Sequence, residues 1–185
     1  MSKVAQAPSF SAEIEAIRAQ ARSHPERGAV TDGYSADRRH VLELLDGALA
    51  TELVCYLRYK RHYFIATGLN AEAAASEFQE HAMQELGHAD QIAARIVQLG
   101  GEPDFAPDTL VARSHADYVA GKSLEEMIRE NLIAERIAID SYRLIIRFLG
   151  DDDPTTRNLI EEILAVEEEH ADDLVGLLRS PSGVR

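Results

Sequence analysis

The stretch AVEEEHADDL, residues 165–174, places three glutamates and a histidine side by side in a segment of helical character. A run of charges on a helix ordinarily forms a solvent-exposed face. Here the apolar residues around the run recur at steps of three and four, the spacing of one helix face. Glu167 and His170 fall on that apolar face, whereas Glu168 and Glu169 point away from it. Half of the run is therefore expected to face the interior.

A second stretch with the same pattern lies earlier in the chain. HAMQELGHAD, residues 81–90, contains Glu85 and His88, so another Glu-x-x-His pair falls on an apolar helix face. Two further periodic stretches each carry one glutamate in the middle of the apolar face, Glu52 and Glu135. The lone glutamates precede the two pairs by nearly the same number of residues. Each half of the chain therefore supplies a lone glutamate and then a Glu-x-x-His pair.

Helix-breaking residues divide most of the chain into four long periodic segments. These run from about Ala36 to Ala66, from after Asn70 to Gly100, from Ser123 to Gly150, and from Asp153 to about Arg179. Their number and length predict an all-α fold, an antiparallel four-helix bundle. Short turns join the first two and the last two helices, whereas residues 101–122 form a connection long enough to cross the bundle. Within it, LVARSHADY at 110–118 can form a short helix.

Residues with strong end preferences support these boundaries. Ser123 and Glu126 have the spacing of a capping box. Asp153 stands directly before a proline, the arrangement of an N-cap followed by the first helical position. Asn70 is the expected N-cap of the second helix, and Gly68 suits a left-handed cap after the first.

The chain is expected to form one domain with an extension at each end. The bundle spans 36–179, the N-terminal extension 1–35 and the C-terminal tail 180–185. Within the N-terminal extension, Ser11 to Arg22 is expected to form a short amphipathic helix with Ile14 and Ile17 facing inward.

The composition excludes several classes of protein. The chain of 185 residues is 45% hydrophobic and 28% charged, as expected for a globular protein. It shows no apolar run long enough to span a membrane and no signal peptide, so a cytoplasmic protein is expected. The net charge of −13 comes without the basic surface that DNA binding needs. The single cysteine, Cys55, cannot form an internal disulfide or a cysteine-based zinc site.

Four carboxylates that face one another inside a bundle need compensation, because an unpaired buried charge is costly. No lysine or arginine is expected on the apolar faces near them. The carboxyl groups can share protons at raised pKa values, or they can bind cations. Two divalent cations would neutralise the four charges, and mixed carboxylate and imidazole ligands suit iron or manganese. The predicted ligands of this two-metal site are Glu52, Glu85, His88, Glu135, Glu167 and His170.

Other side chains near these faces are weaker candidates. Tyr59 and Tyr142 lie two helical turns beyond the lone glutamates and are expected in the core, where either can tune the site. Cys55 is expected to be a small core residue that is open to oxidation. His81 is a weaker candidate, for metal traffic. The histidines expected at the surface or its boundary are His40, His62 and His115.

With these residues the chain resembles ferritin-like proteins, in particular bacterioferritin and the Dps-like cages with a bacterioferritin-type site. The resemblance covers about residues 36–179 and rests on the motifs ATELVCYLRY, HAMQELGHAD, LIAERIAID and ILAVEEEHADDL. It implies that the six predicted ligands form a di-iron ferroxidase centre, with Glu85 or Glu167 as bridges and Tyr59 as the tyrosine usual in the family. It further implies an iron-storage protein that oxidises Fe(II) with O₂ or H₂O₂ and keeps the mineral in a hollow homo-oligomer. Two irons are expected per subunit, with manganese or zinc as possible substitutes.

Two departures from the family pattern bear on cofactor and assembly. Where bacterioferritin has its haem-ligating methionine, this chain has Leu86, so haem is not expected. The chain ends soon after the fourth helix, without a segment for the fifth helix of 24-subunit cages. A dodecamer is therefore favoured over a 24-mer.

Other functions of the same bundle remain open. A rubrerythrin-like di-metal peroxidase or a manganese catalase would use the same ligands, although the chain lacks rubredoxin-type cysteines. A Dps-type protein that coats DNA is disfavoured by the near-neutral charge of the first 40 residues. A bundle that serves only in protein interactions would bind no metal.

Overall fold

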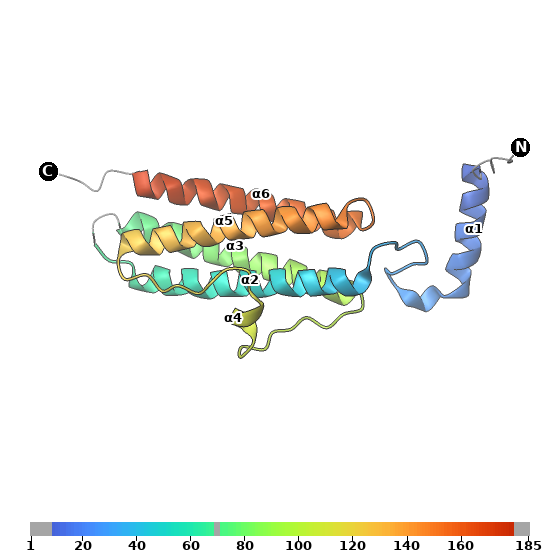
Figure 1. Cartoon of the computed structure of the whole chain (residues 1–185), viewed down its shortest axis with the longest axis horizontal. Helices are drawn as coiled ribbons and strands as arrows, with labels where there is room; N and C mark the ends of the chain where they lie inside the picture. The colour runs from blue at the N-terminus through green and yellow to red at the C-terminus, as the bar shows by residue number, and fades with distance from the viewer. Residues whose placement is uncertain (1–8, 69–70, 180–185) are drawn as a thin grey trace, which may run out of the picture. The chain divides into compact units, whose positions relative to one another are not determined.

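In a computed structural model of the protein, residues 9–68 and 71–179 are described. Four long helices lie side by side, α2 (Arg38–Ile65), α3 (Ala71–Gln98), α5 (Leu124–Leu149) and α6 (Pro154–Arg179) (Figure 1). No strand occurs in the described residues. The expected all-α fold, an antiparallel four-helix bundle, is therefore confirmed.

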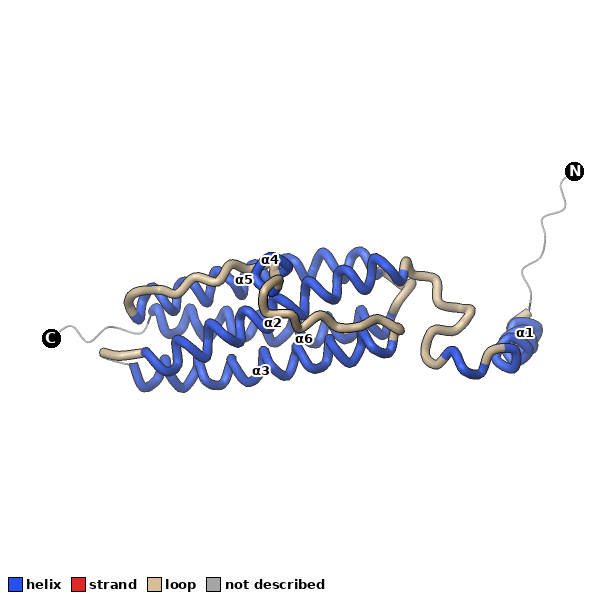
Figure 2. Tube along the Cα trace, turned by 90° about the horizontal axis from the view of Figure 1, so that it is seen from below, coloured by secondary structure: helices blue, strands red, loops and turns tan. Residues whose placement is uncertain are grey.

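The bundle consists of two antiparallel hairpins, α2 with α3 and α5 with α6. The crossover between them, residues 99–123, runs the length of the bundle from the end of α3 to the start of α5 (Figure 2). It contains α4 (Leu110–Arg113), which packs against α2 and is shorter than the stretch suggested by the sequence. Arg113 ties the crossover to α2 through an ion pair with Asp46, in which Nη1 and Oδ2 are 3.0 Å apart.

The helix starts follow the predicted capping residues. The Ser123 hydroxyl accepts a hydrogen bond from the backbone N–H of Glu126 at 3.2 Å. The carboxylate of Asp153 accepts one from the backbone N–H of Thr156 at 2.9 Å. Both N-caps are confirmed, whereas Asn70 lies outside the described residues.

Glycines follow both helices of the first hairpin, but only the glycines after α3 cap their helix. Gly100 has a φ of 76°, and its N–H and that of Gly101 bond back into the last turn of α3 at 2.9 Å. This is the bonding of a Schellman motif, so α3 ends where the sequence predicts. Gly68 also has a positive φ, 109°. Because α2 already ends at Ile65, Gly68 turns the chain after the helix and does not cap it.

The apolar faces of the four helices form the buried core of the bundle. Its fully buried side chains include Leu45, Leu49, Phe78, Ile160 and Leu174. Buried polar side chains interrupt this core on all four helices. No helix among the described residues is long and apolar enough to cross a membrane.

A buried polar network ties α2 to α5 and to the crossover. Arg58 is fully buried, which corrects the expectation that no arginine or lysine lies on the inner faces near the carboxylates. Its Nε donates to Oδ1 of Asn131 at 2.9 Å, and its Nη1 donates to the carbonyl of Asp117 at 3.0 Å. His62, expected at the surface or its boundary, is also fully buried. Its ring nitrogens lie 3.2 Å from Oδ1 of Asn131 and 2.9 Å from the carbonyl of Ala120, which explains how a polar ring is accommodated there.

The chain separates into two compact units, residues 1–34 and residues 35–185. The first unit contains α1 (Phe10–Ser23) and the 3-10 helix η1 (Pro25–Arg27). α1 covers the predicted segment, but none of its residues is buried, and Ile17 is 55% exposed. The expectation that both isoleucines face inward is therefore wrong for Ile17, whereas Ile14 is half-buried.

Candidate metal centre

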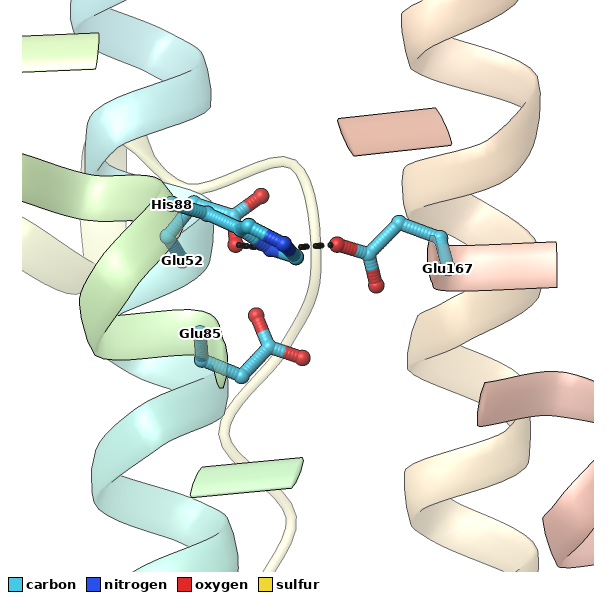
Figure 3. Close-up of side chains that lie close together, drawn as sticks. All are labelled: Glu52, Glu85, His88 and Glu167. Atoms are coloured by element: carbon cyan, nitrogen blue, oxygen red, sulfur yellow. Dashed lines mark hydrogen bonds and ion pairs between the residues drawn. The ribbon is translucent and has the colours of Figure 1, made fainter. Parts of the chain in front are cut away.

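Six buried side chains from the four bundle helices gather inside the core. Glu52 lies on α2, Glu135 on α5, and the two Glu-x-x-His pairs lie on α3 and α6. The three-residue step within each pair places its glutamate and histidine on one helix face. None of the six residues is more than 6% exposed. Figure 3 shows Glu52, Glu85 and His88 pointing toward Glu167 across the space between the hairpins.

The six side chains form two overlapping groups of possible metal ligands. The first group is Glu52, Glu85, His88 and Glu167, and the second is Glu85, Glu135, Glu167 and His170. Within each group the ligand atoms lie within 4.8 Å of one another. Glu85 and Glu167, the shared carboxylates, belong to both groups. The arrangement therefore offers two adjacent cation positions with two carboxylates between them.

Both histidines direct Nδ1 at carboxylates. In His88 this nitrogen lies 3.1 Å from Oε2 of Glu52 and 3.1 Å from Oε1 of Glu167. It can carry only one hydrogen, and its hydrogen bond is to Glu52. In His170 the nitrogen lies 3.5 Å from Oε2 of Glu167 and 3.6 Å from Oε1 of Glu85, beyond a normal hydrogen bond. The imidazoles therefore leave much of the carboxylate surface unsatisfied.

Most of the buried side-chain atoms that lack a hydrogen-bond partner among the described residues lie in this cluster. Buried atoms without a hydrogen-bond partner among the described residues include Oε1 of Glu85, Oε2 of Glu135, both carboxylate oxygens of Glu167, and Nδ1 of His170. Each unpaired buried polar atom costs about 1–3 kcal/mol. Several of them facing one another indicate that the site has another partner. Oxygen atoms with one imidazole nitrogen are a donor set that fits iron or manganese.

The shared carboxylates hold protons strongly when no cation compensates them. Burial, followed by repulsion from Glu167 and Glu52, raises the pKa of Glu85 well above its ordinary value. Burial, followed by repulsion from Glu52 and Glu135, raises the pKa of Glu167 in the same way. These carboxyls therefore keep protons at pH values where an ordinary glutamate is ionised, and a bound cation would replace those protons.

The two site histidines and Glu135, in contrast to Glu85 and Glu167, have pKa values shifted toward their charged forms. Burial alone would lower the pKa of His170, but contacts with three site carboxylates raise it. Burial alone would raise the pKa of Glu135, but its contacts with His170 and Glu167 outweigh burial and lower it to about 2. For His88, Glu52 outweighs burial and raises the pKa. Without metal, both imidazoles therefore favour the protonated form.

Each lone glutamate accepts a hydrogen bond from a tyrosine of the other hairpin. Tyr59 on α2 donates to Oε1 of Glu135, and Tyr142 on α5 donates to Oε1 of Glu52. Both tyrosines are fully buried, so they are core residues as expected and also contact the site. Cys55 is buried and free, as expected of a small core residue.

Two further contacts on α3 surround the second group. Oε1 of Gln84 lies 2.8 Å from Nε2 of His170, a contact that the sequence did not indicate because Gln84 is off the apolar face. His81 is buried, and its ring stacks on His170 with the centroids 4.0 Å apart. Its Nδ1 lies 3.2 Å from the Tyr59 hydroxyl. His40 and His115 are exposed, as expected.

Known proteins share this sequence pattern and fold. Residues 42–182 match the ferritin-like domain family. A bacterioferritin from Rhodobacter capsulatus is 29% identical over 72% of this chain and 80% of the relative. The DNA protection during starvation protein of Pyrococcus furiosus is 32% identical over 72% of this chain and 74% of the relative. The dodecameric thioferritin of Bacteroides fragilis, a bacterioferritin-related protein, aligns with a TM-score of 0.75 at 32% identity, over 77% of this chain and 86% of that chain.

Proposed function

Because the chain belongs to the ferritin-like family of iron-storage proteins, we propose that it oxidises Fe(II) to Fe(III) at a di-iron ferroxidase centre within each subunit. The observation that carries this proposal is the pair of overlapping ligand groups, in which five buried oxygen and nitrogen atoms have no hydrogen-bond partner among the described residues. Family membership makes iron the first candidate substrate, and the donor set agrees with it.

In this proposal each iron would be held by a lone glutamate, a histidine and the two shared carboxylates. The first Fe(II) is held by Glu52 and His88, and the second by Glu135 and His170, as the two groups suggest. Glu85 and Glu167, which belong to both groups, would supply ligand atoms to both ions. Tyr142 and Tyr59 hold the lone glutamates in place through their hydroxyl groups. The centre therefore fixes the distance between two cations and surrounds them with negative charge.

The oxidant is O₂ or H₂O₂, and the electrons balance for either. Two Fe(II) ions lose one electron each. These two electrons and two protons convert one H₂O₂ into two water molecules, or one O₂ into one H₂O₂. The carboxylates assist because their negative charge stabilises Fe(III) more than Fe(II).

We further propose that the Fe(III) product collects inside a hollow homo-oligomer, with twelve subunits favoured. The related Bacteroides fragilis protein is a dodecamer at 32% identity, which supports this size. The net charge of −13 attracts Fe(II) to the assembly. This acidic charge comes without the basic surface that binding to the DNA backbone needs, so we do not propose that the protein coats DNA.

Rapid Fe(II) oxidation by the purified, metal-stripped protein tests the proposal. Glu85→Ala removes a shared carboxylate and should abolish the rapid phase while circular dichroism shows an unchanged helical fold. Glu169→Ala is the matched control, because this glutamate is exposed on α6 beside the site helix face. Full activity in Glu85→Ala contradicts the assignment of the centre. Oxygen evolution from H₂O₂ by the manganese-loaded protein would instead reveal a catalase, and a native mass of a monomer or dimer would contradict storage.

A further inference from the structure

A third group of ligand-type side chains lies outside the six-residue centre. Glu77 and His81 lie one turn apart on α3, and Asp173 lies on α6. One ligand atom from each residue lies within 4.8 Å of the others. We refer to these three residues as the outer cluster. None of them belongs to the two groups that form the candidate di-iron centre.

The outer cluster has the geometry of a cation site. Nε2 of His81 lies 3.7 Å from Oε2 of Glu77 and 3.6 Å from Oδ2 of Asp173. Neither distance is short enough for a normal hydrogen bond. With metal–ligand distances of about 2.0–2.2 Å, two ligands of one tetrahedral ion lie about 3.3–3.6 Å apart. The three atoms therefore need only a small adjustment to share one ion.

Burial divides the outer cluster into an inner and an outer side. The His81 side chain is 2% exposed, whereas those of Glu77 and Asp173 are 38% and 49% exposed. Burial, followed by repulsion from Asp173, raises the pKa of Glu77. A buried imidazole nitrogen thus faces two carboxylates that repel each other and that solvent can reach. A divalent cation would relieve the repulsion and bring Nε2 of His81 and the two carboxylates onto one shared partner.

The outer cluster is in direct contact with the buried centre. The His81 ring stacks on the ring of His170, a candidate iron ligand, with centroids 4.0 Å apart. The other nitrogen of His81, Nδ1, lies 3.2 Å from the hydroxyl of Tyr59, which bonds to Glu135. The His81 ring alone would therefore separate an ion bound at its Nε2 from His170, a member of the second group.

We propose that Glu77, His81 and Asp173 form a third cation site, which binds a divalent first-row transition metal and passes Fe(II) from the surface to the buried centre. One imidazole with two carboxylates suits such ions. With three protein ligands and a solvent-facing side, the site binds metal less tightly than the buried centre and can release it. The passage of Fe(II) rests on the proposed ferroxidase function, whereas the binding of a cation does not.

Zinc binding tests the site without redox chemistry. The full chain is stripped of metal, titrated with Zn²⁺ by calorimetry, and crystallised with Zn²⁺ for anomalous diffraction. The unchanged chain should bind one more zinc ion per subunit than Glu77→Gln/Asp173→Asn, with an anomalous peak beside Nε2 of His81. The control Glu72→Gln/Asp90→Asn changes two exposed carboxylates of α3 outside the cluster and should keep that ion. Equal zinc stoichiometry in the unchanged chain and the Glu77/Asp173 variant would overturn the site.

Iron kinetics tests the passage of metal. With Fe(II) limiting, Glu77→Gln/Asp173→Asn should oxidise iron roughly tenfold more slowly, the scale of outer-shell effects on metal sites, while the total iron oxidised per subunit stays the same. Loss of the outer zinc ion with an unchanged rate would overturn the passage and leave the site. If the unchanged chain binds the outer zinc ion but oxidises no Fe(II), the proposed function fails and the third cation site stands.

Discussion

The hydroxyl of Tyr142 on α5 donates a hydrogen bond to the carboxylate of Glu52 on α2, so one hairpin orients the lone glutamate of the other. Tyr59 and Glu135 repeat the relationship in the opposite direction. The sequence repeats a lone glutamate, a Glu-x-x-His pair and a tyrosine in each half. In the structure, the tyrosine of each half bonds to the lone glutamate of the other half. The two tyrosines should act on different metal positions.

Replacing either tyrosine by phenylalanine tests this division. Tyr142→Phe removes the hydrogen bond to Oε1 of Glu52 and should weaken zinc binding at the first position roughly tenfold, the lower end of such outer-shell effects. Tyr59→Phe should weaken the second position instead. Calorimetry and anomalous occupancy measure the two positions separately. Equal losses at both positions in both variants would show that the tyrosines have no preferred partner.

The stability of the metal-free protein should fall as the pH rises from 5 to 8. Glu85 and Glu167 have folded-state pKa values raised well above 4.5, so the folded state keeps protons that the unfolded chain has released. Stability decreases with pH wherever the folded state binds more protons. The raised pKa of His170 acts in the same direction above its ordinary value of 6.5. Melting temperatures at each pH, after treatment with a chelator, measure the slope.

A matched variant tests whether Glu85 and Glu167 cause this dependence of the melting temperature on pH. Glu85→Gln/Glu167→Gln replaces the shared carboxyls by neutral groups of similar shape, so the melting temperature should depend less on pH between 5 and 8. An unchanged slope would mean that other groups control it. At acid pH the trend reverses, because the pKa of Glu135 is about 2 and its stabilising contribution is lost as the pH falls from about 4.5 toward 2.

Metal loading should stabilise the protein and release protons. Ions that bind only the folded state add stability by mass action, and they must displace protons from the shared carboxyls and the imidazoles. The rise in melting temperature on adding Zn²⁺ should therefore be larger at pH 8 than at pH 5. Calorimetry at pH 7 in buffers with different ionisation enthalpies counts the protons. Identical melting temperatures with and without Zn²⁺ would count against a buried metal site.

The buried network around Arg58 should be important for stability and not for metal binding. Asn131→Ala removes the acceptor of the Arg58 Nε and the partner of His62, and should lower the free energy of unfolding by about 2 kcal/mol. Asn158→Ala, on the exposed face of α6, is the control and should have little effect. Chemical denaturation measures both. A loss of zinc stoichiometry with no loss of stability would contradict this division of roles.

The helix spacing was sufficient to predict the fold and to select the six side chains that the structure brings together. Periods of three and four residues determine which side chains share a face, and that information is local to each helix. Arg58 and His62 were missed because their partners, the carbonyls of Asp117 and Ala120, belong to the crossover. The path of the crossover along α2 cannot be predicted from the spacing of apolar residues within a single helix. Gln84 was missed because only the packing of α6 against α3 brings it to His170.

Neither hairpin contains a complete set of ligands for either cation position. The first group takes Glu167 from the second hairpin, and the second group takes Glu85 from the first. Cations bound there would act as non-covalent cross-links between two halves that the backbone joins only through the crossover. If the crossover were cut, for example by a protease acting at the exposed 117–119 segment, the metal-loaded halves should stay associated in conditions where the metal-free halves separate. If the proposed function holds, iron supply would then also control the lifetime of the folded subunit.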